Sequence, residues 1–248
     1  MPHNKLSFIN DEGLYSCVKS VVEAYRFSLD LSEFNKNIID PIKLTFDMKV
    51  SQRSVEEIIE REIARQLDKT ISNRIGYFHQ NIFAYISPDW CVPEKGYDIV
   101  NKSEKIYVEM KNKHNTMNSS SSQKTFMRMQ NTLLHQSDAT CLLVEVIAKE
   151  SQDKVWLVSL DGERTSHPSI RRVSIDRFYS MVTKEKNAFR CLCEVLPHVI
   201  EDVIQEQQST LHTSTVLEEL QKTSHSLLKS LYLLAFKNYE GFDNLKID

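Results

Sequence analysis

The chain has 248 residues, 41% of them hydrophobic and 26% charged, which is typical of a soluble globular protein with one sizeable core. No run of about 18 apolar residues occurs, so the sequence predicts no membrane span. The N-terminal segment also lacks the apolar region of a signal peptide. The net charge of −3 argues weakly against a nucleic-acid partner, but residues 95–128 hold seven Lys and Arg against three Asp and Glu.

The cysteines are odd in number and show no Cys-x-x-Cys spacing: Cys17, Cys91, Cys141, Cys191 and Cys193. This pattern predicts free thiols in a reducing cytoplasm rather than disulfides or a zinc site.

The first part of the chain has helical periodicity. Residues 11–29 carry apolar side chains at helical spacing, whereas residues 42–50, after Asp40-Pro41, fit either a helix or a strand. Residues 54–57 have the form of a capping box, and the apolar stripe that follows predicts a helix of roughly 18–28 residues, continuous or interrupted at Gly76. Glu60 and Glu62 lie on its polar face.

The second part alternates between helix and strand. A helix that starts in the serine run 119–122 would bury Phe126, Met129 and Leu133. Residues 139–148 and 153–162 read as two strands, and from Ala188 onward the pattern is helical. The order predicts an α/β (α+β) fold in which helices flank a central mixed sheet.

The stretch with the clearest chemical pattern is residues 97–113, YDIVNKSEKIYVEMKNK, which reads as a β-hairpin around a polar turn at 102–105. A turn centred between residues 103 and 104 places Asp98 opposite Glu109. Side chains alternate along a strand, which predicts two faces. One face would carry Tyr97, Ile99, Ile106, Val108 and Met110, and the other would carry Asp98, Val100, Tyr107, Glu109 and Lys111.

Two facing carboxylates are destabilising unless positive charge lies near them. Magnesium, a hard cation that prefers oxygen ligands, fits between Asp98 and Glu109, and Lys111 adds a positive charge one pleat further on. The hairpin is therefore a candidate metal site with a helper lysine.

Asp98, ten intervening residues and then Glu109-Met110-Lys111 resemble the PD-(D/E)XK nuclease signature, with Tyr97 where proline is often found. The longer run at 96–126, together with GYFHQNIF at 76–83, WLVSLDG at 156–162 and RRVSIDRFYSMV at 171–182, resembles the type II restriction endonuclease family whose characterised members cut GGNCC sites. The likeness covers roughly the middle half of the chain.

The resemblance implies a nuclease core at roughly residues 51–182 of a single domain 1–248, with helical additions at 1–50 and 183–248. It implies Mg2+-dependent hydrolysis of double-stranded DNA by Asp98, Glu109 and Lys111, with the Met110 backbone carbonyl as a further metal ligand. It also implies a homodimer on a palindromic site, a bacterial cytoplasmic location and a cognate DNA methyltransferase. In related nucleases a helix before the hairpin sometimes contributes another acidic ligand to the metal site. Glu60 or Glu62 could take this role here; the alternative is that both lie on a solvated helix face.

Two basic or hydroxyl-rich segments are candidate DNA contacts. The serine run is either a flexible loop or a helix start whose N–H and hydroxyl groups meet phosphates. Arg171 and Arg172 either lie on a solvated face or reach a groove edge. The candidate residues are Lys113, Asn115, Ser119, Ser120, Ser121, Gln123, Lys124, Arg128, Arg171 and Arg172.

Two other functions remain as alternatives. A repair or recombination nuclease of the RecB-like branch would carry Gln-x-x-x-Tyr after the lysine, but Met127 follows Gln123 and Leu134 follows Gln130 at that spacing. A non-catalytic binding protein would use Asp98, Glu109 and Lys111 as an ordinary surface ion cluster.

Overall fold

The structure, a computed structural model, describes residues 6–114, 116–206, 213–236 and 247. The chain forms two compact units, one from residues 1–23 and 74–208 and the other from residues 24–73 and 209–248. The division falls inside helix α4 (Val55–Ile86), and residues 1–23 belong to the unit that contains the sheet.

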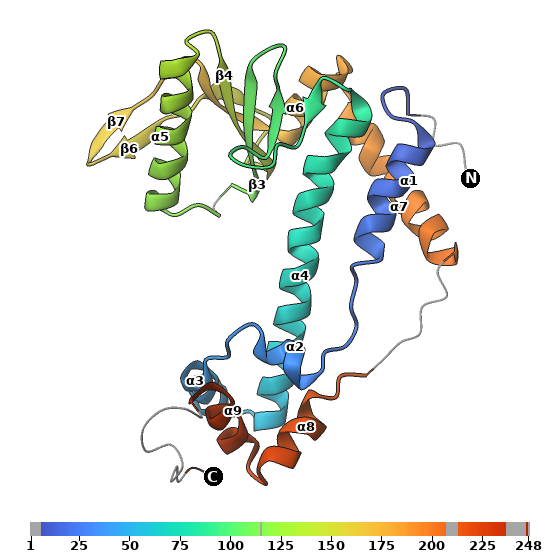
Figure 1. The fold of residues 1–248 in the computed structure, drawn as a ribbon, viewed down its shortest axis with the longest axis vertical. Coiled ribbons are helices and arrows are strands. Elements are labelled where there is room, and N and C mark those ends of the chain that lie inside the picture. Colours follow the sequence, from blue (N-terminus) through green and yellow to red (C-terminus); the bar gives the residue numbers. More distant parts are fainter. Residues whose placement is uncertain (1–5, 115, 207–212, 237–246, 248) are drawn as a thin grey trace. The chain divides into compact units, whose positions relative to one another are not determined.

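The first unit is built on a six-stranded mixed sheet, as the sequence predicts (Figure 1). The central neighbours β3, β4 and β8 run parallel, whereas β1, β2 and β5 pair antiparallel with their neighbours. The strands, in spatial order, are β1 (Trp90–Cys91), β2 (Ile99–Asn101), β3 (Ile106–Lys113), β4 (Thr140–Ile147), β8 (Ile170–Ser174) and β5 (Asp153–Val155).

Helices cover both faces of this sheet (Figure 1). On one face, the core formed with the sheet draws on α1 (Asp11–Val22), the last turns of α4, α6 (Ile175–Thr183) and α7 (Ala188–Glu206). On the other face, α5 (Ser119–His135) buries Phe126, Met129 and Leu133, as its periodicity predicts. A small second sheet, β6 (Val158–Leu160) with β7 (Glu163–Thr165), lies beside α5.

The hairpin forms with the predicted register: Ile99 pairs with Val108, Val100 with Tyr107 and Asn101 with Ile106. The next step of this register places Asp98 opposite Glu109. Ile99, Val108 and Met110 share one face, as predicted, and this face enters the core that includes α1 and α7. Tyr97 does not join them, because it precedes the paired strand and packs instead on Tyr107, with ring centroids 5.1 Å apart.

Two further expectations are corrected by packing. The predicted strand at 153–162 is split into β5 and β6, because the Trp156 side chain is buried in the core. Its ring packs on that of Phe126, with 5.5 Å between the ring centroids. Helix α4 continues through Gly76 for 32 residues, because its later apolar residues pack on the sheet. Helix α5 begins in the serine run, as predicted, and Asn118 caps it by accepting the Ser121 N–H at 2.8 Å.

The second unit is helical and has its own core. Residues 42–50 form a helix rather than a strand, and the predicted capping box is confirmed, since Ser54 and Glu57 each accept the other's backbone N–H. The helices beside the start of α4 are α2 (Leu31–Asn35), α3 (Pro41–Ser51), α8 (Val216–Thr223) and α9 (Leu227–Phe236). Among the described residues, no helix is long and apolar enough to cross a membrane.

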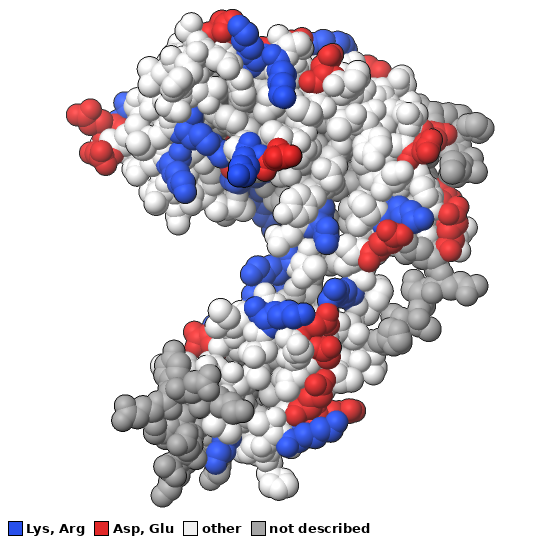
Figure 2. All heavy atoms as spheres, in the orientation of Figure 1, with Lys and Arg blue, Asp and Glu red and all other residues white. Residues whose placement is uncertain are grey.

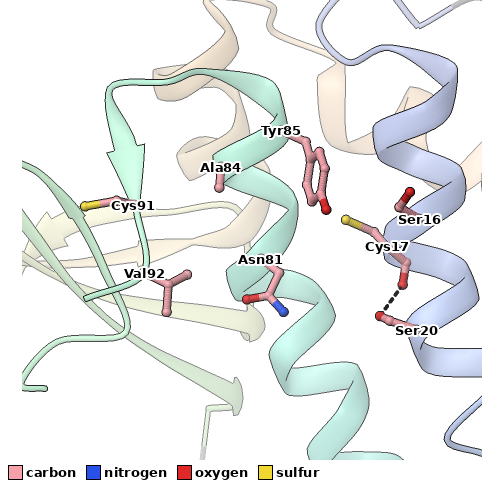
Figure 3. A pocket seen from close by; sticks show the side chains of 8 residues that line it. All are labelled: Ser16, Cys17, Ser20, Asn81, Ala84, Tyr85, Cys91 and Val92. Atoms are coloured by element: carbon pink, nitrogen blue, oxygen red, sulfur yellow. Dashed lines mark hydrogen bonds between the residues drawn. The ribbon is translucent and has the colours of Figure 1, made fainter. Parts of the chain in front are cut away.

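A pocket of about 500 Å³ lies between α1, α4 and the β1 strand (Figure 3). Cys17 lies on its wall, and burial raises the pKa of this thiol to about 12. A protonated thiol is a poor nucleophile, and no carboxylate lines the pocket. Cys17 is therefore a poor nucleophile, and the pocket lining provides no acidic metal ligands.

His79 on α4 generates a prediction about pH. Among the described residues its Nδ1 atom has no hydrogen-bond partner, and burial lowers its pKa to about 4. In the unfolded chain a histidine has a pKa of about 6.5, so as the pH falls His79 is protonated in the unfolded state before it is protonated in the folded state. The free energy of unfolding therefore decreases as the pH falls from about 6.5 to about 4.

We expect the thermal midpoint to fall less between pH 7 and pH 5 in His79→Phe than in the parent. His198→Phe is the control, because the His198 side chain is 77% exposed. Equal falls in His79→Phe and the parent would contradict the assignment.

Candidate active site

The candidate site lies near the carboxyl ends of the parallel strands β3, β4 and β8, on the sheet face that α5 covers. In register, Glu109, Leu143 and Arg172 are neighbours, and one pleat further Lys111, Glu145 and Ser174 are neighbours. Residues in register share a face, so the strands bring these charged side chains to one patch. Figure 2 shows basic side chains over α5 and, beside them, basic groups touching acidic ones.

The centre of the patch is Glu109, which is buried with only 8% of its surface exposed. Lys111 Nζ donates to its Oε1 atom at 2.7 Å, and the Arg128 guanidinium from α5 pairs with its Oε2 atom. A buried carboxylate requires such compensation. Sequence reasoning placed Arg128 among DNA contacts and missed its pairing with Glu109.

Asp98, half-buried beside the hairpin, accepts the backbone N–H of Met110 at 2.7 Å through Oδ2. Burial raises the pKa of Asp98, the Met110 N–H acts in the opposite direction, and the Glu109 carboxylate raises the pKa further. The raised pKa is a sign that this carboxylate would gain from a nearby cation.

The three expected metal-binding groups have the chemistry of a magnesium site. Because the N–H and C=O of one strand residue point to the same side, the Met110 carbonyl points to the edge that carries Asp98. The donors are then two carboxylates and one carbonyl, all oxygen. Within the described part of the chain, no three His, Cys, Asp or Glu side chains are grouped to hold a metal. Magnesium is usually held by one or two carboxylates, with water and substrate phosphate completing its shell.

A second ion cluster adjoins the first and was not foreseen. Glu145, the register neighbour of Lys111, is only 1% exposed and pairs with Arg172, whose Nε atom lies 2.9 Å from Oε1. His114 Nδ1 lies 3.1 Å from the other oxygen, and Gln152 donates to it at 3.3 Å. The signal in the sequence was a lone acid inside the apolar run 139–148, because a charge in a buried strand needs a partner.

The remaining sequence candidates fall into three groups. Lys113, Ser119, Ser120, Ser121 and Lys124 are exposed near the end of β3 and the start of α5. Gln123, Arg171 and Arg172 bind internal partners: the Ser159 carbonyl, Asp153 and Glu145. Asn115 lies outside the described residues.

The two acids of α4 proposed as extra ligands belong to the second unit. Glu60 is exposed, and Glu62 is held within its own helix by Arg65, whose Nε atom donates to it at 2.6 Å, and by Gln66. Arg65 and Gln66 thus already compensate the charge of Glu62.

The Glu145 cluster predicts a large loss of stability when its acid is removed. Glu145→Ala leaves Arg172 partly buried without its carboxylate, and breaking a buried pair in this way costs about 3 kcal/mol. The matched control is Glu150→Ala, because Glu150 is 70% exposed and pairs weakly with Lys154, so the expected loss is about 0.5 kcal/mol or less. Urea unfolding measures both, and a loss for Glu145→Ala as small as the control's would contradict the cluster's structural role.

Comparison with known proteins gives the chain's family. Residues 6–205 match the family model described as Eco47II restriction endonuclease. The chain is 33% identical to the type II restriction enzyme Sau96I of Staphylococcus aureus over 221 residues, covering 84% of this chain and 85% of that protein. It is 29% identical to the type II restriction enzyme Eco47II of Escherichia coli over 215 residues, covering 82% and 89%. The chain therefore belongs to the Eco47II restriction endonuclease family and is a type II restriction endonuclease.

Proposed function

We propose that Asp98, Glu109 and Lys111 form the active site of this endonuclease on a PD-(D/E)XK core, and that the reaction depends on Mg2+. The substrate is double-stranded DNA with a short palindromic site of the GGNCC type, which a cognate methyltransferase in the bacterial cytoplasm protects. The observation that carries the proposal is the hairpin register, whose next step places Asp98 opposite Glu109, with Lys111 bound to Glu109, in a chain of the restriction endonuclease family.

Each residue has a distinct role in the proposal. Asp98, Glu109 and the Met110 carbonyl would hold the ion, which when bound neutralises charge on the scissile phosphate and lowers the pKa of an attacking water. Lys111 lies 2.7 Å from the Glu109 carboxylate, where its ammonium group orients that carboxylate and provides positive charge for the phosphate.

The exposed groups around this centre are suited to hold the DNA backbone. Lys113 ends β3, and Ser119, Ser120, Ser121 and Lys124 lie in the first turns of α5. Hydroxyls, lysines and the N–H groups of a helix start are the donors that bind phosphates, so these residues are the proposed backbone contacts. Arg171 and Arg172 support the strands instead, because their guanidinium groups already bind Asp153 and Glu145.

The test is cleavage of phage DNA by the parent, Asp98→Asn, Glu109→Gln and Lys111→Ala. The parent should give discrete fragments with Mg2+ and little cleavage with Ca2+, whose looser oxygen shell positions water poorly. Each variant should cut at least about a hundredfold more slowly, since even outer partners of metal ligands contribute roughly 10- to 100-fold. Single-turnover rates measure the difference.

Binding in chelator separates lost chemistry from lost structure. Asp98→Asn and Glu109→Gln should bind the cognate duplex at least as tightly as the parent, because a carboxylate no longer repels the phosphate. Glu104→Gln, in the exposed hairpin turn, is the matched control and should cut like the parent. Cleavage by Glu109→Gln near the parent rate would eliminate the proposed site.

We also propose that the enzyme acts as a homodimer, because a two-fold protein matches a palindromic site and supplies one active site per strand. Sedimentation of the complex with a cognate duplex in Ca2+ should give two chains per duplex. A complex with one chain that cuts both strands in Mg2+ would contradict the dimer.

A further inference from the structure

Both oxygens of the Glu109 carboxylate are already bound by cations of the protein. Lys111 Nζ donates to Oε1 at 2.7 Å, and Arg128 pairs with Oε2. With Asp98 beside them, two carboxylates and two cations give the patch no net charge. An incoming metal ion therefore competes with these two cations for the Glu109 oxygens, and it gains little attraction from the site as a whole.

Arg128 is the cation that can release Glu109 and stay in place. Its NH1 atom donates to the Gly96 carbonyl at 2.6 Å, and its guanidinium lies 4.7 Å from the centre of the Tyr97 ring. These two contacts do not involve Glu109, so they would hold the guanidinium after that ion pair opens. Within the described residues the buried Nε atom has no partner, which leaves a donor for a new acceptor.

Lys111 is bound differently. It lies two residues from Glu109 on the same strand, so opening its contact would still leave its charge beside the carboxylate. Arg128 comes from α5, and its NH2 atom can leave Glu109 while its NH1 atom keeps the contact with the Gly96 carbonyl. The ion pair that opens when the metal binds is then the one between Arg128 on α5 and Glu109 on β3.

We propose that Arg128 is a positioning residue that occupies Glu109 in the metal-free enzyme and yields it to the metal ion. Once released, its forked guanidinium is suited to a DNA phosphate, which pairs with arginine in two parallel hydrogen bonds. Metal and DNA then bind cooperatively, because the phosphate offsets the charge that the metal adds. This inference rests on the proposed role of Glu109 as a metal ligand.

The test is the affinity of the DNA-free protein for Mn2+, measured by titration calorimetry or by the loss of the free Mn2+ spin-resonance signal. Arg128→Met should bind Mn2+ at least about tenfold more tightly than the parent, because a unit charge a few ångströms from the ligands is removed. Arg128→Lys keeps the charge and should bind Mn2+ like the parent. Lys102→Met removes an exposed charge from the turn of the same hairpin and should also match the parent.

The double variant Arg128→Met/Glu109→Gln locates the effect. If this variant lacks the increase in Mn2+ affinity seen in Arg128→Met, the result supports competition between Arg128 and the metal ion for Glu109. If Arg128→Met binds Mn2+ no more tightly than the parent while Glu109→Gln binds it less tightly, the inference fails and the proposed metal site stands. If no substitution at Glu109 or Asp98 changes Mn2+ affinity, the metal site fails together with the inference. Thermal unfolding of each variant confirms that the folded state is being compared.

Discussion

The arrangement of the sheet unit around its site depends on the charge compensation of one buried carboxylate. Glu109 lies in a strand whose neighbours are apolar, and an uncompensated charge there would cost several kcal/mol. Lys111 compensates it from the same strand, and Arg128 compensates it from α5. The second contact ties the helix to the strand that carries the proposed chemistry.

The neighbouring strand repeats this arrangement. Glu145 is compensated by Arg172 from β8, and a second nitrogen of Arg172 donates to the His114 carbonyl at 3.0 Å. His114 stands directly after β3, where the chain leaves the sheet toward α5. One cluster therefore ties β3 to α5, and the other ties the end of β3 to β4 and β8. Removing one partner of such a buried pair is strongly destabilising, because it leaves the other charge uncompensated.

The sequence predicted local features more successfully than tertiary ones. The hairpin register followed from strand alternation and a polar turn, and the buried face of α5 followed from helical spacing. The pairing of Glu109 with Arg128 could not be predicted in this way, because Arg128 is 19 residues further along the chain and reaches Glu109 only once α5 packs on the sheet. Trp156 split a strand by its packing on Phe126, and Tyr97 changed face because it lies before the first pair of the ladder. The likeness to restriction enzymes was carried by the hairpin run and its flanks, and the family match extends it over residues 6–205.

The central claim is that a divalent ion binds between the carboxylates of Asp98 and Glu109. Anomalous diffraction from Mn2+ in crystals of the enzyme with a duplex whose scissile phosphate resists hydrolysis tests this most directly. The account predicts an anomalous peak within about 2.5 Å of oxygens from both carboxylates, next to the phosphate. A peak bound by other side chains, with the Asp98 and Glu109 carboxylates left to protein donors alone, would contradict it.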